Sequence, residues 1–237
     1  MPLSKLPSRR RIYLMRHGEV AYFDQRGPMQ KPTEAVLTDE GREQALAAAT
    51  ALADVPFDCV VTSGLTRTKQ TAEIVIAGRP LPIEEHPALH EIAPALSTGV
   101  SPEQIGEAIA QGFMGPIDRE TQFLGGETYG AFVDRVLPCW DQLLARRDWN
   151  TLLLVAHGGV NRAILAHVLG CGLSGFGALE QDPAAINIID VDDAGQGVIR
   201  AVNYTPYNPL KQGLHLTTME RLFVEYVQLR ASLESPS

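Results

Sequence analysis

The stretch Ile12–Phe23, IYLMRHGEVAYF, decides how the chain is organised. It opens with four apolar residues that show no alternation, which is typical of a strand buried on both faces in the middle of a sheet. The strand leads directly into Arg16 and His17. Because a buried cation needs a counter-ion, the stretch predicts that an anion binds where this strand ends.

The composition is that of an ordinary globular protein. The 237 residues are 45% hydrophobic and 20% charged, which suffices for one large domain with a buried core. The net charge of -8 argues against nucleic acid or an anionic membrane surface as the main partner. No apolar window approaches the ~20 residues that span a bilayer. With three cysteines, no CxxC spacing and no signal-peptide pattern, we expect a cytoplasmic protein.

Strand-like and helix-like segments alternate along the chain. We expect strands at residues 12–15, 57–64, 81–92, 150–159, 184–193 and 197–206. We expect helices at residues 39–55, 65–78, 127–148, 160–170 and 217–234, the third of them kinked or interrupted at Pro138. This order predicts an α/β fold, a three-layer sandwich whose mostly parallel central sheet is flanked by helices on both faces.

Two segments depart from this pattern. Residues 1–10 are expected to be an N-terminal tail, and the basic run Arg9-Arg10-Arg11 to be solvated; residues 11–237 then form a single domain. Between residues 97 and 126, glycine, proline and polar residues surround one short helical piece, which Ser101 can cap and Pro102 can begin. We expect this segment to be an inserted flap over the sheet.

Three of the predicted strands end in polar residues. The first ends in Arg16 and His17, the second in 62–64 with Arg67 one turn further on, and the strand at 150–159 in His157. Ligands of such sheets bind beyond the carboxyl ends of the strands, so these side chains should meet at one edge. Arginine matches two phosphoryl oxygens with its planar fork. A neutral imidazole can attack phosphorus, and a second can stabilise the developing charge. The pattern predicts a phosphoryl-transfer site.

Six motifs follow one another over roughly residues 12 to 165: LMRHGE, LTDEGREQA, SGLTRTKQTA, LHEI, GGET and VAHGGV. In this order they resemble the histidine phosphatase superfamily, the phosphoglycerate-mutase-like group of branch 1 type. The resemblance implies a histidine acid phosphatase-type phosphoric monoester hydrolase that acts on a small phosphorylated metabolite, without a metal or another cofactor. It implies these site residues: His17 as the phosphorylated nucleophile, Glu91 as the general acid, His157 as catalytic and phosphate-binding, and Arg16, Arg67, Gly18 and Gly158 as phosphate-binding.

Several alternatives stay open at this point. Glu19 and Glu127 compete with Glu91 for the role of acid. The family often has a polar residue six positions after the histidine, where this chain has Phe23, so its substrate-side contacts differ. The mutases' insertion rich in arginine and tyrosine is absent after Glu91, which favours a hydrolase over the alternative, mutase-type phosphoryl transfer. A catalytically silent phospho-ligand-binding or dimerisation module of the same fold is a further alternative. The substrate and a homodimeric assembly are left open.

Overall fold

The computed structural model describes residues 8–24, 27–28, 32–95, 106, 109, 112–115 and 117–234. Within these residues six strands form one sheet in the order β5-β4-β6-β1-β7-β8. Their bounds are β1 (Arg9–Arg16), β4 (Cys59–Thr62), β5 (Ile83–Glu85), β6 (Thr151–Ala156), β7 (Ile186–Asp192) and β8 (Gly197–Tyr204). Strands β5, β4, β6 and β1 run parallel to one another, whereas β7 runs antiparallel to both β1 and β8. The predicted mostly parallel sheet, with the first strand near its centre, is confirmed.

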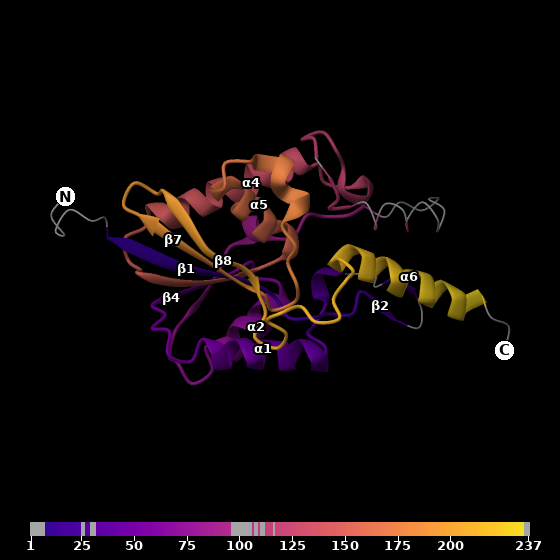
Figure 1. Ribbon diagram of the computed structural model, residues 1–237, viewed down its shortest axis with the longest axis horizontal. Helices are drawn as coiled ribbons and strands as arrows, with labels where there is room; N and C mark the ends of the chain where they lie inside the picture. Colours follow the sequence, from indigo (N-terminus) through magenta and orange to yellow (C-terminus); the bar gives the residue numbers. More distant parts are fainter. Residues whose placement is uncertain are drawn as a thin grey trace.

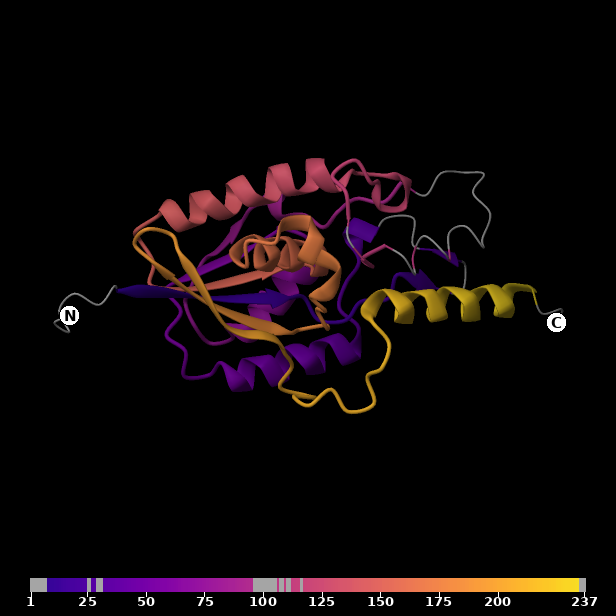
Figure 2. The same cartoon turned by 45° about the horizontal axis from the view of Figure 1, so that its top comes forward.

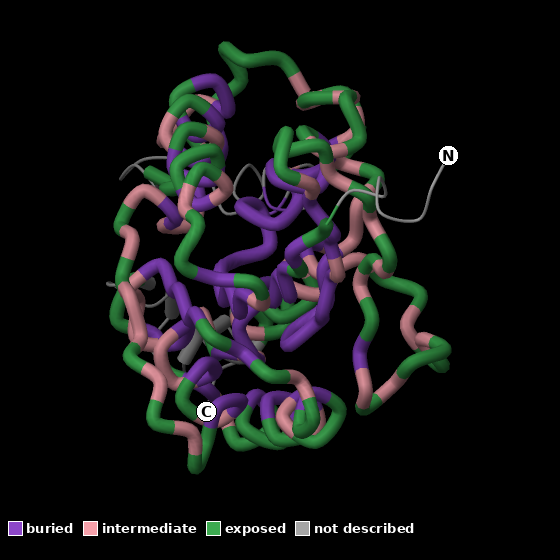
Figure 3. Tube along the Cα trace, turned by 90° about the vertical axis from the view of Figure 1, so that its left-hand side faces the viewer, coloured by how far each residue is buried: buried purple, intermediate pink, exposed green. Residues whose placement is uncertain are grey.

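Helices cover both faces of this sheet (Figures 1 and 2). Helices α4 (Tyr129–Ala145) and α5 (Gly158–Val168) lie on one face, and α1 (Asp39–Ala51) and α2 (Thr66–Val75) on the other. Alternate residues of β1 serve the two cores: Ile12 and Leu14 pack with α4 and α5, and Tyr13 and Met15 with α1 and α2. Buried backbone gathers in the middle of the molecule in Figure 3. The three-layer fold is therefore the predicted one.

Short elements connect these layers. The two-residue strands β2 (Phe23–Asp24) and β3 (Gly27–Pro28) pair with each other, apart from the main sheet. The described 3₁₀ turns are η2 (Pro32–Glu34), η3 (Pro87–Leu89), η4 (Phe123–Gly125) and η5 (Gly172–Ala178). Helix α6 (Thr218–Glu234) closes the described part of the chain. None of the helices described combines the length and apolar character that crossing a membrane requires.

The basic run at the start of β1 is part of the sheet, not a solvated tail. β1 begins at Arg9, three residues earlier than predicted. Arg10 is buried with its guanidinium 4.0 Å from the Trp149 ring centroid, and it donates to two backbone carbonyls at the end of α4. Arg11 pairs with Asp190 of β7 at 2.6 Å. The expectation of a solvated run is wrong for Arg10, because a stacked, hydrogen-bonded guanidinium can be buried, whereas Arg9 and Arg11 are exposed. Residues 1–7 of the predicted tail lie outside the described residues.

Two further expectations concern the middle of the chain. Helix α4 continues through Pro138 to Ala145, so it is not interrupted there, while a kink at Pro138 stays a prediction. The helical piece predicted around Ser101 and Pro102 lies outside the described residues. From the same segment, Phe113 and Phe123 stack with ring centroids 5.2 Å apart and belong to the core beside α4.

The loop after β1 is pressed against the start of α1. The backbone N–H of Thr38 donates to the carbonyl oxygen of Glu19 at 3.0 Å, and the Thr38 hydroxyl caps α1 by accepting from the N–H of Gly41 at 3.0 Å. A Cβ on Gly41 would overlap the Glu19 carbonyl, and one on Gly18 would overlap the Gly41 carbonyl. Both glycines are therefore needed for this approach, which sets the position of the loop that follows His17.

The close approach predicts that alanine at position 41 destabilises the protein, although alanine has the higher helix propensity. Alanine at a helix position ordinarily stabilises by about 1 kcal/mol relative to glycine. We expect Gly41→Ala instead to lower the free energy of unfolding by about 1–3 kcal/mol, because the added methyl group has no room. Urea denaturation measures this, with Ala49→Gly on the same helix as the control for ordinary propensity. A more stable Gly41→Ala protein would contradict the close approach.

Candidate functional site

The strand register brings the predicted site residues to one edge. Arg16 is level with Ala156 across the β1–β6 ladder, and Thr62 is level with Val155 across β4–β6. The three strands therefore end together, and the residues that follow them meet. These are His17 after β1, Ser63 after β4 with Arg67 in the first turn of α2, and His157 after β6, with Glu91 supplied by the segment beyond η3.

His17 is buried and oriented by the backbone carbonyl of the next residue. Its Nδ1 lies 2.7 Å from the carbonyl oxygen of Gly18. A carbonyl only accepts, so the hydrogen is on Nδ1 and the lone pair is on Nε2. Burial, Arg67 and Arg16 lower the pKa of His17 well below its ordinary value, so the ring is neutral at pH 7. Nε2 accepts from Arg67 Nε at 3.3 Å, which places the nucleophilic lone pair beside a guanidinium.

His157 packs against His17 and has one nitrogen without a partner. The two ring centroids are 5.2 Å apart. His157 Nε2 lies 2.8 Å from the hydroxyl oxygen of Ser63, whereas its buried Nδ1 has no hydrogen-bond partner among the described residues. Burial, followed by Arg67 and His17, lowers the pKa of His157 well below its ordinary value. Both rings are therefore neutral at pH 7, beside the guanidinium of Arg67.

Arg16 is held at one end of its guanidinium and open at the other. Nη1 donates to the carbonyl oxygen of Gln181 at 2.7 Å and to the hydroxyl of Thr218 at 3.2 Å. Nε is buried and has no partner in the part of the chain that the structure describes. A Cβ on Gly158 would lie 3.7 Å from this Nε, so the missing side chain leaves space beside it. A buried donor next to such a space is suited to bind an anion.

Glu91 reaches the same place. Its Oε2 accepts from the N–H of Gly159 at 2.9 Å and lies 3.8 Å from where a Cβ of Gly158 would be. A Cβ on Gly159 would overlap the Glu91 carboxylate, so a larger residue there would displace that side chain. Gly18 is different, because its N–H already donates to the hydroxyl of Thr71 at 3.1 Å and its Cα faces α1. The described contacts give Gly18 a packing role; a phosphate-binding role for it stays a prediction.

The two competing carboxylates are engaged elsewhere. Glu127 forms a bidentate pair with Arg135 at 2.8 and 2.9 Å. Burial alone would raise the pKa of Glu127, but the hydrogen bonds from Arg135 and from the N–H of Ala93 outweigh it, and the pKa is lowered. Glu19 lies 3.3 Å from the Thr38 hydroxyl, and burial and Glu40 raise its pKa. Neither carboxylate has a described hydrogen bond with Arg16, His17 or His157.

Three supporting residues were missed by sequence reasoning. Ser63 was noted as polar, but not as the partner of His157. Arg135 donates to the carbonyls of residues 88, 90 and 91 and so fastens the segment that carries Glu91. Thr218 contacts Arg16 from the opposite end of the chain. The only local signal was the threonine pair at 217–218, since a helix start needs one capping hydroxyl and not two.

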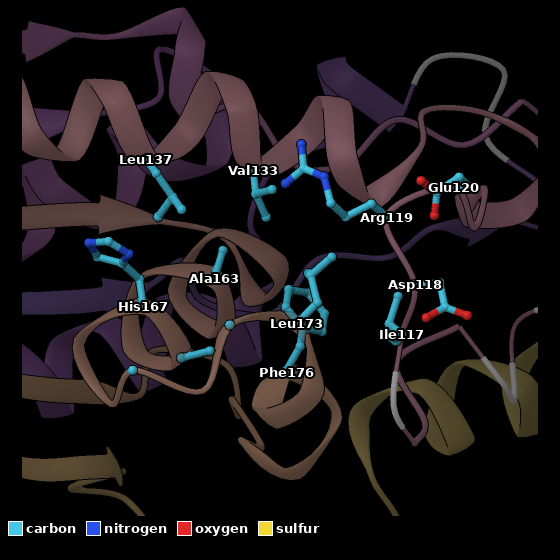
Figure 4. A pocket seen from close by; sticks show the side chains of 13 residues that line it. Ile117, Asp118, Arg119, Glu120, Val133, Leu137, Ala163, His167, Leu173 and Phe176 are labelled. Atoms are coloured by element: carbon cyan, nitrogen blue, oxygen red, sulfur yellow. The ribbon is translucent and has the colours of Figure 1, made fainter.

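A separate cavity of about 590 Å³ lies between α4, α5, η5 and the segment 117–120. Figure 4 shows Val133 and Leu137 of α4 facing Ala163 and His167 of α5, with Phe176 below them. None of the residues predicted for the site lines this cavity. In the described residues, no three His, Cys, Asp or Glu side chains gather in a way that could hold a metal ion.

Comparison with known proteins gives a family match. A family model described as the histidine phosphatase superfamily, branch 1, matches residues 12–205. A 2-carboxy-D-arabinitol-1-phosphatase from Triticum aestivum is 29% identical over 219 residues, which cover 88% of this chain and 43% of the wheat protein. This chain thus spans less than half the length of that relative.

Shorter relatives match over more of their own length. A glucosyl-3-phosphoglycerate phosphatase from Mycolicibacterium vanbaalenii is 32% identical over 172 residues, covering 68% of this chain and 75% of that protein. The native structure of a mycobacterial glucosyl-3-phosphoglycerate phosphatase superimposes with a TM-score of 0.67 at 26% identity, covering 83% of this chain and 99% of the other. These relatives are phosphatases that share the fold and are of similar sequence.

The lowered pKa values predict the protonation state of both buried histidines. We expect ¹⁵N-detected histidine NMR to show neutral rings for His17 and His157 at the pH where a free imidazole is half protonated, with the hydrogen of His17 on Nδ1. In the unfolded chain both rings titrate near 6.5. The unfolded state therefore takes up extra protons below that pH, and the free energy of unfolding should fall as the pH is lowered from 7 to 5. A titration of His17 near pH 6.5 in the folded protein would contradict this.

Proposed function

Because the chain belongs to branch 1 of the histidine phosphatase superfamily, we propose that it is a phosphomonoesterase that hydrolyses a small phosphorylated metabolite through a phosphohistidine on His17. The relatives named above are phosphatases of small phosphate esters, as their names state, which supports this substrate class. The proposal takes Glu91 as the general acid, and Arg16, Arg67 and His157 as the groups that bind the phosphoryl oxygens.

One observation carries the proposal. Arg16 Nε and His157 Nδ1 are both buried, and neither has a protein partner among the described residues. Leaving a buried polar nitrogen unpaired costs about 1–3 kcal/mol, and such groups in native proteins are usually satisfied by a bound molecule or water. Two of them lie in a site that also holds Arg67 and a neutral His17. A phosphate dianion supplies the acceptors and the charge that this arrangement lacks.

The first chemical step follows from the position of the His17 lone pair. Nε2 attacks phosphorus and forms the N–P bond while the ester P–O bond breaks. Arg67 Nε, which donates to His17 Nε2 before the reaction, then donates to a phosphoryl oxygen. The Gly18 carbonyl stabilises the positive charge that develops on the ring through the Nδ1 hydrogen. Protonated Glu91 gives its proton to the leaving oxygen, so that an alcohol departs instead of an alkoxide.

The second step returns the site to its starting state. The Glu91 carboxylate takes a proton from a water molecule, whose oxygen attacks phosphorus as the N–P bond breaks. His17 recovers its neutral Nδ1–H form, and phosphate leaves from between the arginines. Glu91 changes protonation once in each step, and the N–H of Gly159, 2.9 Å from its Oε2, holds it in place for both.

The nucleophile is testable by trapping. We expect rapid quenching without acid, with ³²P-labelled p-nitrophenyl phosphate, to trap an adduct that is labile to acid and stable to alkali. His17→Asn should abolish labelling and lower kcat by several orders of magnitude, because nucleophile and pocket act as a unit. Retained labelling in His17→Asn would show that another residue is phosphorylated. With phosphoglycerate as the substrate instead, isomerised product without free phosphate would favour the mutase alternative.

The acid is testable through the leaving group. Glu91→Gln should lower kcat/KM for an alkyl phosphate by about 10²–10³-fold, since an alkoxide leaves poorly without a proton. It should lower the value for p-nitrophenyl phosphate by much less, because that phenolate needs little assistance. Glu19→Gln is the matched control and should affect both substrates equally and weakly. A selective loss in Glu19→Gln, or equal losses in Glu91→Gln, would overturn the assignment.

A further inference from the structure

Helix α6 begins beside the site. Residues 218–234 lie beyond the part of the chain that the family model matches. Figures 1 and 2 show α6 starting close to the ends of the central strands and running away from the sheet toward the C-terminus. Its Met219 and Tyr226 are buried in the same core cluster as α4 and α5. The helix is thus anchored on the domain, and its first turn has a defined position.

The first turn is capped by Thr217, not by Thr218. The N–H of Glu220 donates to the Thr217 hydroxyl at 3.2 Å, and the N–H of Thr217 donates to Glu220 Oε2 at 2.7 Å. This reciprocal pair is a capping box. The hydroxyl of Thr218 is therefore not needed to cap the helix, and its partners call for another explanation.

The Thr218 hydroxyl connects a carboxylate to Arg16. Its Oγ1 lies 2.6 Å from Glu180 Oε1 and 3.2 Å from Arg16 Nη1, with the Gln181 carbonyl oxygen at 3.1 Å. Glu180 also pairs with Arg162 at 3.0 Å. Burial would raise the pKa of Glu180, but Arg162 and the hydrogen bonds lower it, so it is a charged acceptor. The single hydroxyl hydrogen goes to this near carboxylate, which leaves an oxygen lone pair for Arg16.

This contact completes the restraint of Arg16. Nη1 carries two hydrogens, and the Gln181 carbonyl and the Thr218 hydroxyl accept both. Because a guanidinium is planar and rigid, fixing both Nη1 hydrogens fixes the direction of the remaining donors. Among these, Nε is the unpartnered donor beside Gly158.

We propose that Thr218 is a positioning residue that holds Arg16 for phosphate, so that the C-terminal helix is part of the phosphate-binding site. This inference rests on the proposed function, since it requires Arg16 to bind phosphate. It also assigns a role in the site to a residue some 200 positions from Arg16. The expected loss is one of ligand binding and not of folding, because Thr217 continues to cap the helix when Thr218 is changed.

The test compares two neighbouring hydroxyls. Thr218→Val, Thr218→Ser, Thr217→Val and Arg16→Lys are assayed for inhibition by orthophosphate and by vanadate, for kcat and KM with p-nitrophenyl phosphate, and for Tm. We expect Thr218→Val to weaken both inhibitors about tenfold, the loss typical of one hydrogen bond to a charged group. Thr218→Ser should restore tight binding. Thr217→Val should lower Tm through loss of the cap, with inhibition unchanged.

The outcomes distinguish a failure of the Thr218 role from a failure of the phosphate-binding role of Arg16. If Arg16→Lys weakens both inhibitors and Thr218→Val does not, Thr218 has no positioning role. The same conclusion follows if Thr217→Val weakens them as much as Thr218→Val, since the position of the helix and not the hydroxyl would then be responsible. If Arg16→Lys itself binds both inhibitors like the unchanged protein, the phosphate-binding role of Arg16 fails, and with it the proposed function.

Discussion

Two guanidinium groups and two imidazole rings are buried against one another at the carboxyl edge of the sheet. The residues around them must supply acceptors for these donors or keep the rings neutral. Water is largely excluded, since Arg67 is 3% exposed and His157 is fully buried. The fold limits the cost of burial by keeping both rings neutral, and by giving Arg16 Nη1 two neutral oxygens as partners. Arg16 Nε and His157 Nδ1 remain buried without a partner among the described residues, which costs free energy of folding. Binding sites commonly contain such groups because a bound ligand satisfies them.

Around this centre, fixed backbone groups orient side chains that must not move. The Gly18 carbonyl sets the tautomer of His17, and the N–H of Gly159 holds the Glu91 carboxylate. Arg135 donates to the carbonyl of Glu91 and to two carbonyls before it, and is itself paired with Glu127. Glu91 accepts from the backbone N–H groups of Gly159 and Ile92, whereas Glu127 is paired with a guanidinium that lowers its pKa. The two glutamates therefore differ in the charge of their partners.

Much of this arrangement was predictable from sequence, for a local reason. An apolar run followed at once by Arg16-His17 or by His157 indicates both a buried strand and the polar residues at its carboxyl end. Parallel strands place such ends at the same edge of the sheet. The Thr38 cap likewise lies beside the helix that it begins. What could not be predicted depends on contacts between distant segments. No residue near Arg10 in the sequence indicates that it stacks on Trp149. A run of arginines ordinarily predicts a solvent-exposed segment. The partnership of Arg16 with Thr218 has no periodicity or motif to indicate it.

The place of β1 in the sheet has a consequence for biosynthesis. Along the sequence β1 precedes the other strands of the sheet, yet its two neighbours are β6 and β7, whose paired residues begin at Thr151 and Ile186. The centre of the sheet therefore cannot form until residues 151–192 have also been synthesised, and until then both hydrogen-bonding edges of β1 are open. Contacts of such long sequence separation fold slowly and leave strands exposed to wrong partners. The basic residues at the head of β1, which are ordered partners in the finished protein, carry like charge that repels the same strand of another nascent chain.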